Sequence, residues 1–247
     1  GVTAATMVHA GFTGVWDVLE GEHNVLEALS PSPKPGEMVK DLGSRFFVTE
    51  TAIKPYPVGY PIQAALDAFF TLHRQHGLTV ENVDRITVRL PQDGAGIVND
   101  RSMPDINCQH MIAMALVDGD VTFASTHSYQ RMSDPAVLAV KERVNLVADP
   151  DLMDPEAPRS ARVAVVLKDG TTVEQFTPYA FGTKQSPMPT DTVNAKVRAL
   201  LEPVLGAART ETVIQRVNAL EGVALVRELL PSLTITSEEM SSATFTH

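Results

Sequence analysis

Apolar residues recur at helical spacing directly after a proline-rich stretch. They lie three or four residues apart, which predicts an amphipathic helix over residues 61–76. Pro61 suits the first turn of this helix, because its missing N–H would have no intrahelical partner there. Gly77 suits the end of the helix. The repeating apolar residues are Ile62, Leu66, Phe69 and Leu72.

Alternation of apolar and polar residues predicts strands further along the chain. Residues 85–90 alternate cleanly, and residues 144–147 form a shorter candidate. Residues 161–167 and 171–177 flank an Asp-Gly turn, which is a strong hairpin signal. Strands and helices alternate without regular βαβ spacing. The pattern therefore favours an α+β fold with an antiparallel sheet.

Helical patterns also occur elsewhere in the chain. In the middle, residues 111–117 read as a buried helix, and Asp134 and Pro135 form the start of another, whereas Gly94 and Gly96 indicate a loop. At the two ends, further helices are expected in the segments 2–10, 25–29, 193–201, 213–220 and 223–230, with Pro203 interrupting the helical pattern of the C-terminal part.

The termini lead to two further expectations. From about residue 236 Ser and Thr dominate, so we expect a disordered tail. The chain opens with Gly1 and passes directly into a helical pattern, so we expect it to begin within a domain.

Composition restricts the class of protein. The chain has 247 residues, enough for one large domain or two ordinary ones, and its apolar content of 44% is normal for a globular protein. The net charge of −10, without a basic block, argues against a nucleic-acid partner. Cys108 is the sole cysteine, which excludes an intrachain disulfide and favours a reducing compartment such as the cytoplasm. Neither a membrane-spanning run nor a signal peptide is predicted.

The proline-rich stretch is the main candidate for chemistry. Three prolines within residues 55–61 hold the backbone extended, and Lys54 is the cation of this stretch. A lysine held still beside a helix N-terminus would make an anion-binding corner. The same residues also fit a solvated surface lysine ahead of a rigid turn. The local pattern leaves both interpretations open.

Other motifs give weaker signals. His73 and His76 have a metal-like spacing, but they occupy the last turn of a helix, where positive charge is favoured, and no acidic or cysteine partner lies nearby. Asp105 and His110 fit either an acid–base pair or a helix cap beside an ordinary histidine. No phosphate-binding loop or nucleophile motif is present, so neither a metal nor an organic cofactor is predicted.

Several stretches resemble the MmgE/PrpD family, which includes 2-methylcitrate dehydratases, cis-aconitate decarboxylase and iminodisuccinate epimerase. The central one is Lys54-Pro55-Tyr56-Pro57 running into Gln63-Ala64-Ala65-Leu66-Asp67-Ala68. The others occur in the family's order, and together they cover residues 2–230. They are Ala10-Gly11-Phe12-Thr13-Gly14, Leu19-Glu20-Gly21-Glu22, the run 109–119, and Gly182-Thr183-Lys184-Gln185-Ser186-Pro187-Met188.

The resemblance implies a domain organisation. Residues 48–183 would be an α+β lid inserted between segments of an all-helical domain, and residues 1–47 and 184–247 would be remnants of that domain. Family enzymes are nearly twice this length. The helical domain is therefore expected to be incomplete here, and its N-terminal half is expected as a partner, from the same parent chain or a separate subunit. Homo-oligomers, such as a dimer, are also expected.

The resemblance also implies a site. Lys54 matches the family's pocket lysine and would neutralise a substrate carboxylate, and Tyr56 would orient the same group or donate a proton. Gln63 stands where many relatives have histidine. It could hydrogen-bond the substrate but could not shuttle a proton. His110 is a further substrate-binding candidate on the lid wall. The proton-abstracting base would belong to the missing half.

The implied activity is that of a hydro-lyase acting on a small tricarboxylate or hydroxy acid, such as 2-methylcitrate in propionate metabolism. A decarboxylase or epimerase of the same family is one alternative, and a non-catalytic, truncated binding module is another. No cofactor is implied.

Overall fold

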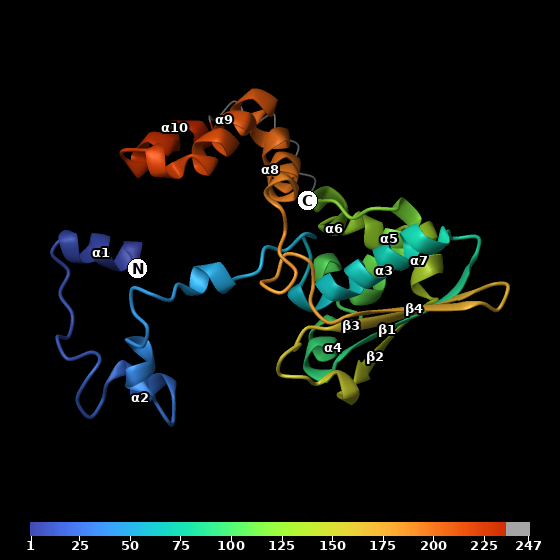
Figure 1. Ribbon diagram of the computed structural model, residues 1–247, viewed down its shortest axis with the longest axis horizontal. Coiled ribbons are helices and arrows are strands. Elements are labelled where there is room, and N and C mark those ends of the chain that lie inside the picture. The colour runs from blue at the N-terminus through green and yellow to red at the C-terminus, as the bar shows by residue number, and fades with distance from the viewer. Residues whose placement is uncertain (236–247) are drawn as a thin grey trace. The chain divides into compact units, whose positions relative to one another are not determined.

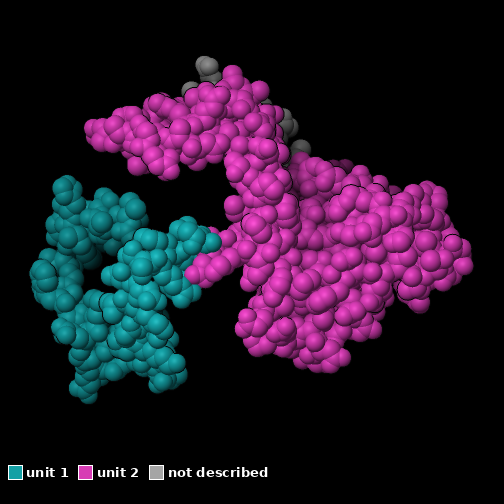
Figure 2. Space-filling model, viewed as in Figure 1, with its two compact units in different colours: residues 1–49 teal, residues 50–247 magenta. Residues whose placement is uncertain are grey.

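The computed structural model describes residues 1–235, so the predicted disordered tail lies outside the described residues. The chain divides into two compact units, residues 1–49 and residues 50–247, which are coloured separately in Figure 2. The predicted division into a lid and two remnants of a helical domain stays a prediction. No described helix is long and apolar enough to cross a membrane.

The second unit is built on a four-stranded mixed sheet with the strand order β2-β1-β3-β4. β1 (Val83–Pro91) lies at the centre, where it pairs in parallel with β2 (Val144–Asp149) and antiparallel with β3 (Ala161–Leu167). β3 continues into β4 (Thr172–Thr177) through the predicted Asp-Gly hairpin. The fold is therefore mixed α/β, and the predicted strands are present.

Helices cover one face of this sheet (Figure 1). α3 (Gln63–His76) packs on β3 and β4, and α5 (Cys108–Asp118) packs on α3 and β2. The alternation predicted for β1 is confirmed, because Ile86, Val88 and Leu90 are buried toward the helices. The predicted apolar face of α3 is also confirmed. Its residues Ile62, Leu66, Phe69 and Leu72 are buried in the core, and Gly77 ends the helix with φ +58°.

The expectation of an antiparallel sheet was wrong for one pairing. β2 runs parallel to β1, and in their register Val88 lies opposite Leu146. The connection from β1 to β2 contains α4 (Gln92–Val98), α5, α6 (Phe123–Thr126) and α7 (Pro135–Lys141). A strand that returns through a helical crossover joins its neighbour in parallel, and the irregular spacing of these helices hid this connection in the sequence.

Two other local expectations were also wrong. Gly94 and Gly96 lie within α4 and not in a loop. At Gly94 a Cβ atom would lie 3.4 Å from the Cβ atom of Pro61, so a small residue allows α4 to approach the start of α3 closely. Pro203 lies inside α8 and does not end it.

The remaining helices lie toward the two ends of the chain. Residues 223–225 are not helical, and Pro231 lies within the last short helix, so the helix predicted over residues 223–230 was displaced. The bounds are α1 (Val2–His9), α2 (Val25–Leu29), α8 (Thr190–Leu205), α9 (Ala207–Asn218), a 3-10 turn at Val226–Leu229 and α10 (Leu230–Leu233).

The first unit has no apolar core of its own. Within residues 1–49 the side chain classed as buried is that of Asn24, which caps α2, and large apolar residues are exposed. Trp16 is 100% exposed and Phe12 is 61% exposed. Burial of each large apolar side chain contributes roughly 1.5 to 3 kcal/mol, so a segment that leaves them in water gains little stability from its own packing.

We therefore expect this chain to associate through residues 1–49, with a second copy or with a helical fragment. Trp16 is the sole tryptophan, so its fluorescence reports on this segment alone. The emission maximum should shift to shorter wavelength as protein concentration rises, in step with an increase in sedimentation coefficient. A Trp16 emission that stays that of a water-exposed indole at every concentration, both in the chain alone and with the helical fragment added, would contradict the expectation.

Candidate functional site

The proline-rich loop, residues 53–61, is fastened to two distant parts of the second unit. The N–H of Ile53 donates to the carbonyl of Gly182 at 2.9 Å, and the N–H of Gly59 donates to the carbonyl of Asp105 at 2.8 Å. The loop then enters a 3-10 turn at Tyr60–Ile62 and continues into α3. Prolines fix the backbone dihedrals within the loop, and these bonds fix its two ends.

Gln63, at the first position of α3, holds the loop from the inside. Its side chain is 0% exposed. Its Nε2 donates to the carbonyls of Tyr56 at 2.9 Å and Val58 at 3.1 Å, and its Oε1 accepts the N–H of Tyr56 at 3.3 Å. A substrate could bond to this amide only in place of one of these loop bonds. The substrate-binding role of Gln63 stays a prediction, and the structure gives the side chain a loop-bracing role.

Replacing Gln63 with leucine should destabilise the fold by about 2–4 kcal/mol, because it leaves buried backbone groups of the loop without partners. The measurement is urea denaturation of both proteins. Gln75→Leu is the matched control, because Gln75 lies on the same helix and is exposed. Equal stability of the Gln63 and Gln75 variants would show that the amide does not brace the loop.

Lys54 is exposed at the start of the loop, and its ammonium group folds back onto the loop. Its Nζ donates to the carbonyl of Val58 at 3.1 Å. A second ammonium group, that of Lys196 on α8, donates to the carbonyl of Lys54 itself. Nothing in the sequence signalled Lys196, because it lies 142 residues further along the chain.

Tyr56 forms a pair with Asp67, a residue to which the sequence analysis gave no role. The Tyr56 hydroxyl interacts electrostatically with the Asp67 carboxylate, and the Tyr56 ring stacks on Phe70 with ring centroids 5.6 Å apart. Burial, followed by the charge of Asp67, raises the pKa of Tyr56, so its hydroxyl stays protonated. Asp67 also accepts the N–H of Phe181 at 2.7 Å. The sequence did contain a signal for this pair, because Asp67 is a single carboxylate within the otherwise apolar stretch 64–70 of the helix.

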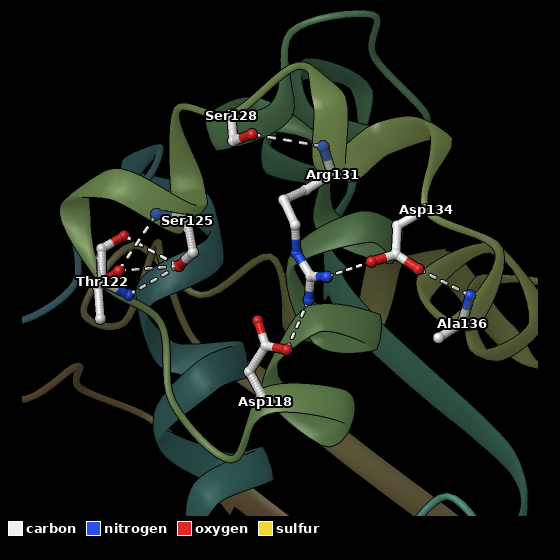
Figure 3. Close-up of polar contacts among 7 residues, drawn as sticks. All are labelled: Asp118, Thr122, Ser125, Ser128, Arg131, Asp134 and Ala136. Carbon is white, nitrogen blue, oxygen red and sulfur yellow. Dashed lines mark hydrogen bonds and ion pairs between the residues drawn. The ribbon is translucent and has the colours of Figure 1, made fainter. Parts of the chain in front are cut away.

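His110 lies apart from this arrangement. It is 1% exposed on α5, and its Nε2 is buried without a hydrogen-bond partner within the part of the chain that the structure describes. Burial lowers its pKa to about 4, and the charges of Lys141 and Arg131 act in the same direction. Figure 3 shows Arg131 between Asp118, at the end of α5, and Asp134, the N-cap of α7. Substrate binding by His110 stays a prediction, and would require this interior to open.

The buried imidazole predicts a pH dependence of stability. Between pH 6.5, the ordinary pKa of histidine, and about pH 4, the unfolded chain binds a proton at His110 that the folded chain does not. Stability should therefore fall through this window as pH falls, by about 3 kcal/mol in total from this residue.

The difference between wild type and His110→Leu isolates this contribution, because leucine fills the buried site without titrating. The slope of unfolding free energy against pH should flatten in the variant. The exposed His76→Gln should leave the slope as it is in wild type. Parallel curves for wild type and His110→Leu would contradict the prediction.

A cavity of about 200 Å³ lies beside the loop, but the two cations in its lining, Lys184 and Arg159, are already paired. The lining includes Tyr60, Lys184 and Arg159, whereas none of the four predicted site residues belongs to the described lining. Lys184 pairs with Glu50 at 3.7 Å, and Arg159 pairs with Asp93 at 2.7 Å. The loop at Lys54 is therefore the better place for an anion. Within residues 1–235 no three His, Cys, Asp or Glu side chains gather as a metal site would require.

The sheet, and the fastened loop from Tyr56 onward, belong to a known class of domain. Residues 56–220 match the family model of the MmgE/PrpD C-terminal domain. The chain belongs to the MmgE/PrpD family, so the resemblance seen in the sequence is confirmed.

Two curated relatives are similar to the chain. Cis-aconitate decarboxylase of Mus musculus is 27% identical over 217 residues, which cover 80% of this chain and 43% of that protein. Cis-aconitate decarboxylase-like protein oryM of Aspergillus oryzae is 24% identical over 252 residues, which cover 93% of this chain and 52% of that protein. The chain thus spans about half the length of the curated relatives it matches.

Proposed function

We propose that this chain contributes part of the active site of a lyase that acts on a small tricarboxylate. The rest of the pocket would come from the part of the family fold that the relatives have and this chain does not cover. The observation that supports this proposal is the fastened loop, which presents the ammonium group of Lys54 on a backbone that cannot easily move.

Lys54 has a chemical task in such a reaction. Breaking a C–C or C–H bond of the acid leaves an electron pair that spreads onto a carboxylate that remains on the substrate, and a fixed ammonium group stabilises the added negative charge. Because the loop is already braced by Gln63, little reorganisation would accompany the reaction. Tyr56 retains its proton and would orient the substrate or return a proton once its interaction with Asp67 is exchanged for one with the substrate.

We favour decarboxylation of a cis-aconitate-like acid over dehydration of 2-methylcitrate. In decarboxylation the C–C bond to one carboxylate breaks, CO₂ departs, and the remaining electron pair takes up a proton. Dehydration begins with a base that removes a proton, and the loop offers an ammonium group, a protonated phenol and an amide. The names of both relatives point to the same reaction.

The test is to assay the chain with and without a fragment that corresponds to the uncovered half of a relative. CO₂ release and product formation would be followed by NMR with cis-aconitate, citrate and 2-methylcitrate as substrates. We expect CO₂ release from cis-aconitate in the presence of the fragment. Loss of water from 2-methylcitrate instead would favour the dehydratase.

A stable assembly that turns over none of the three acids would overturn the proposal and favour a non-catalytic binding module. Complex formation must therefore be verified by sedimentation in the same samples, so that an inactive mixture of separate chains is not mistaken for an inactive assembly.

A further inference from the structure

Two ammonium groups meet the same short loop from different parts of the chain. Lys54 bonds to the carbonyl of Val58, four residues further along the loop. Lys196, on α8, bonds to the carbonyl of Lys54. The loop therefore carries the amine of one of its own residues and receives the amine of a residue from a helix that begins at Thr190.

Neither ammonium group is neutralised by a carboxylate among residues 1–235, because both of their hydrogen bonds go to backbone carbonyls. Other lysines of the second unit differ in this respect. Lys141 pairs with Asp100, and Lys184 pairs with Glu50. Burial, followed by the charge of Lys54, lowers the pKa of Lys196, so the two cations affect each other electrostatically. An anion placed beside both would relieve this repulsion.

We propose that Lys196 is a second substrate-binding residue, and that Lys54 and Lys196 each hold one carboxylate of a substrate with at least two carboxylates. The assignment rests on the proposed function for the identity of the acid. It adds a residue from α8 that was not among the site residues expected from the sequence.

The exchange of bonds is favourable for an anion. Each ammonium group bonds to a neutral carbonyl, whereas a carboxylate would give a charge-assisted bond about twice as strong. The loop itself need not move, because Gln63 and the bond between Ile53 and Gly182 hold it independently of both lysines. An acid with a single carboxylate can engage one ammonium group at a time. The site should therefore prefer di- and tricarboxylates over monocarboxylates.

The experiment measures binding to the whole chain by calorimetry at constant ionic strength. The probes are tricarballylate, a tricarboxylate that does not react, and butyrate, a monocarboxylate. The proteins are wild type, Lys54→Ala, Lys196→Gln, Lys196→Arg and the control Lys168→Ala, whose lysine lies in the turn between β3 and β4.

We expect wild type to bind tricarballylate more tightly than butyrate, and Lys196→Gln to weaken tricarballylate binding by about tenfold or more, which corresponds to about 1.4 kcal/mol. Lys196→Arg should keep most of the affinity, because the charge remains. Lys168→Ala should bind like wild type. A wild-type chain that does not bind tricarballylate would overturn the assignment, and so would equal affinities of Lys196→Gln and Lys168→Ala.

This result is separable from the proposed function. An assembly without lyase activity would remove the proposed reaction, while a chain that binds tricarballylate in a Lys196-dependent way would still contain the two-lysine site. Conversely, an active assembly in which Lys196→Gln changes neither binding nor KM would refute the role of Lys196 alone.

Discussion

Replacing Lys54 with alanine is expected to lower kcat/KM of the assembled enzyme by about 100- to 10,000-fold, a loss typical of removing one charge-stabilising donor. The physical reason is the position of the ammonium group. It lies on a loop fastened at Ile53 and Gly59, and within residues 1–235 its bond goes to a carbonyl and not to a carboxylate. Its charge is therefore available to a substrate.

The melting temperature should change little in the same variant. Lys54 is exposed, and the hydrogen bond that it loses is a single one at the protein surface, whereas Gln63 continues to brace the loop. Lys168→Ala is the control for the loss of one positive charge and should leave kcat/KM unchanged. Normal kinetics in Lys54→Ala would remove this lysine from the site, and a large fall in melting temperature would assign it to the fold instead.

The parts of the fold that the sequence predicted are those encoded locally. The helix before Gly77 follows from apolar spacing and a left-handed stop, and the β3–β4 hairpin follows from one Asp-Gly turn. Lys54 stood out for a similar reason, since prolines fix a backbone without help from distant residues. In each case the physical cause lies within about twenty consecutive residues, so a pattern in the sequence is enough to reveal it.

The parts that the sequence did not predict depend on contacts between distant segments. The parallel pairing of β2 with β1 follows from the path of four intervening helices. The substitution of Gln63 for histidine could be read as a change in chemistry, yet the amide turns inward to the loop backbone. Lys196 contacts the carbonyl of Lys54 because of where α8 lies, and no sequence motif indicates this contact. The loop and Lys54 could thus be predicted from the sequence. The bracing of the loop by Gln63 and the approach of a second cation, Lys196, could not.

Gly182 is a further residue whose importance arises from a distant contact, and its replacement by alanine should have the largest effect on stability. Its φ is +90°, a region that side chains rarely adopt, and a Cβ atom there would lie 1.9 Å from the carbonyl oxygen of Ile53. The obstacle is backbone and not the flexible end of a side chain. The carbonyl of Gly182 also accepts the N–H of Ile53. Both the N–H and the carbonyl of Ile53 therefore lie against Gly182.

Gly182→Ala should therefore destabilise the second unit by about 3 kcal/mol or more, through backbone strain and the loss of the bond to Ile53. Gly170→Ala is a matched control, because Gly170 has a similar φ of +88° but no atom within 4 Å of the added Cβ. It should show the strain alone, about 1 kcal/mol. Denaturation of both variants measures the difference, which is the contribution of the close approach.

The same substitution should weaken the anion site, because the carbonyl displaced by the new methyl group belongs to the residue directly before Lys54. Tricarballylate binding should fall in Gly182→Ala under conditions where the protein remains folded, and stay as in wild type in Gly170→Ala. If the two variants lost equal stability and bound the acid equally, the contact between Gly182 and Ile53 would not hold the loop. The position of Lys54 would then depend on the prolines and Gln63 alone.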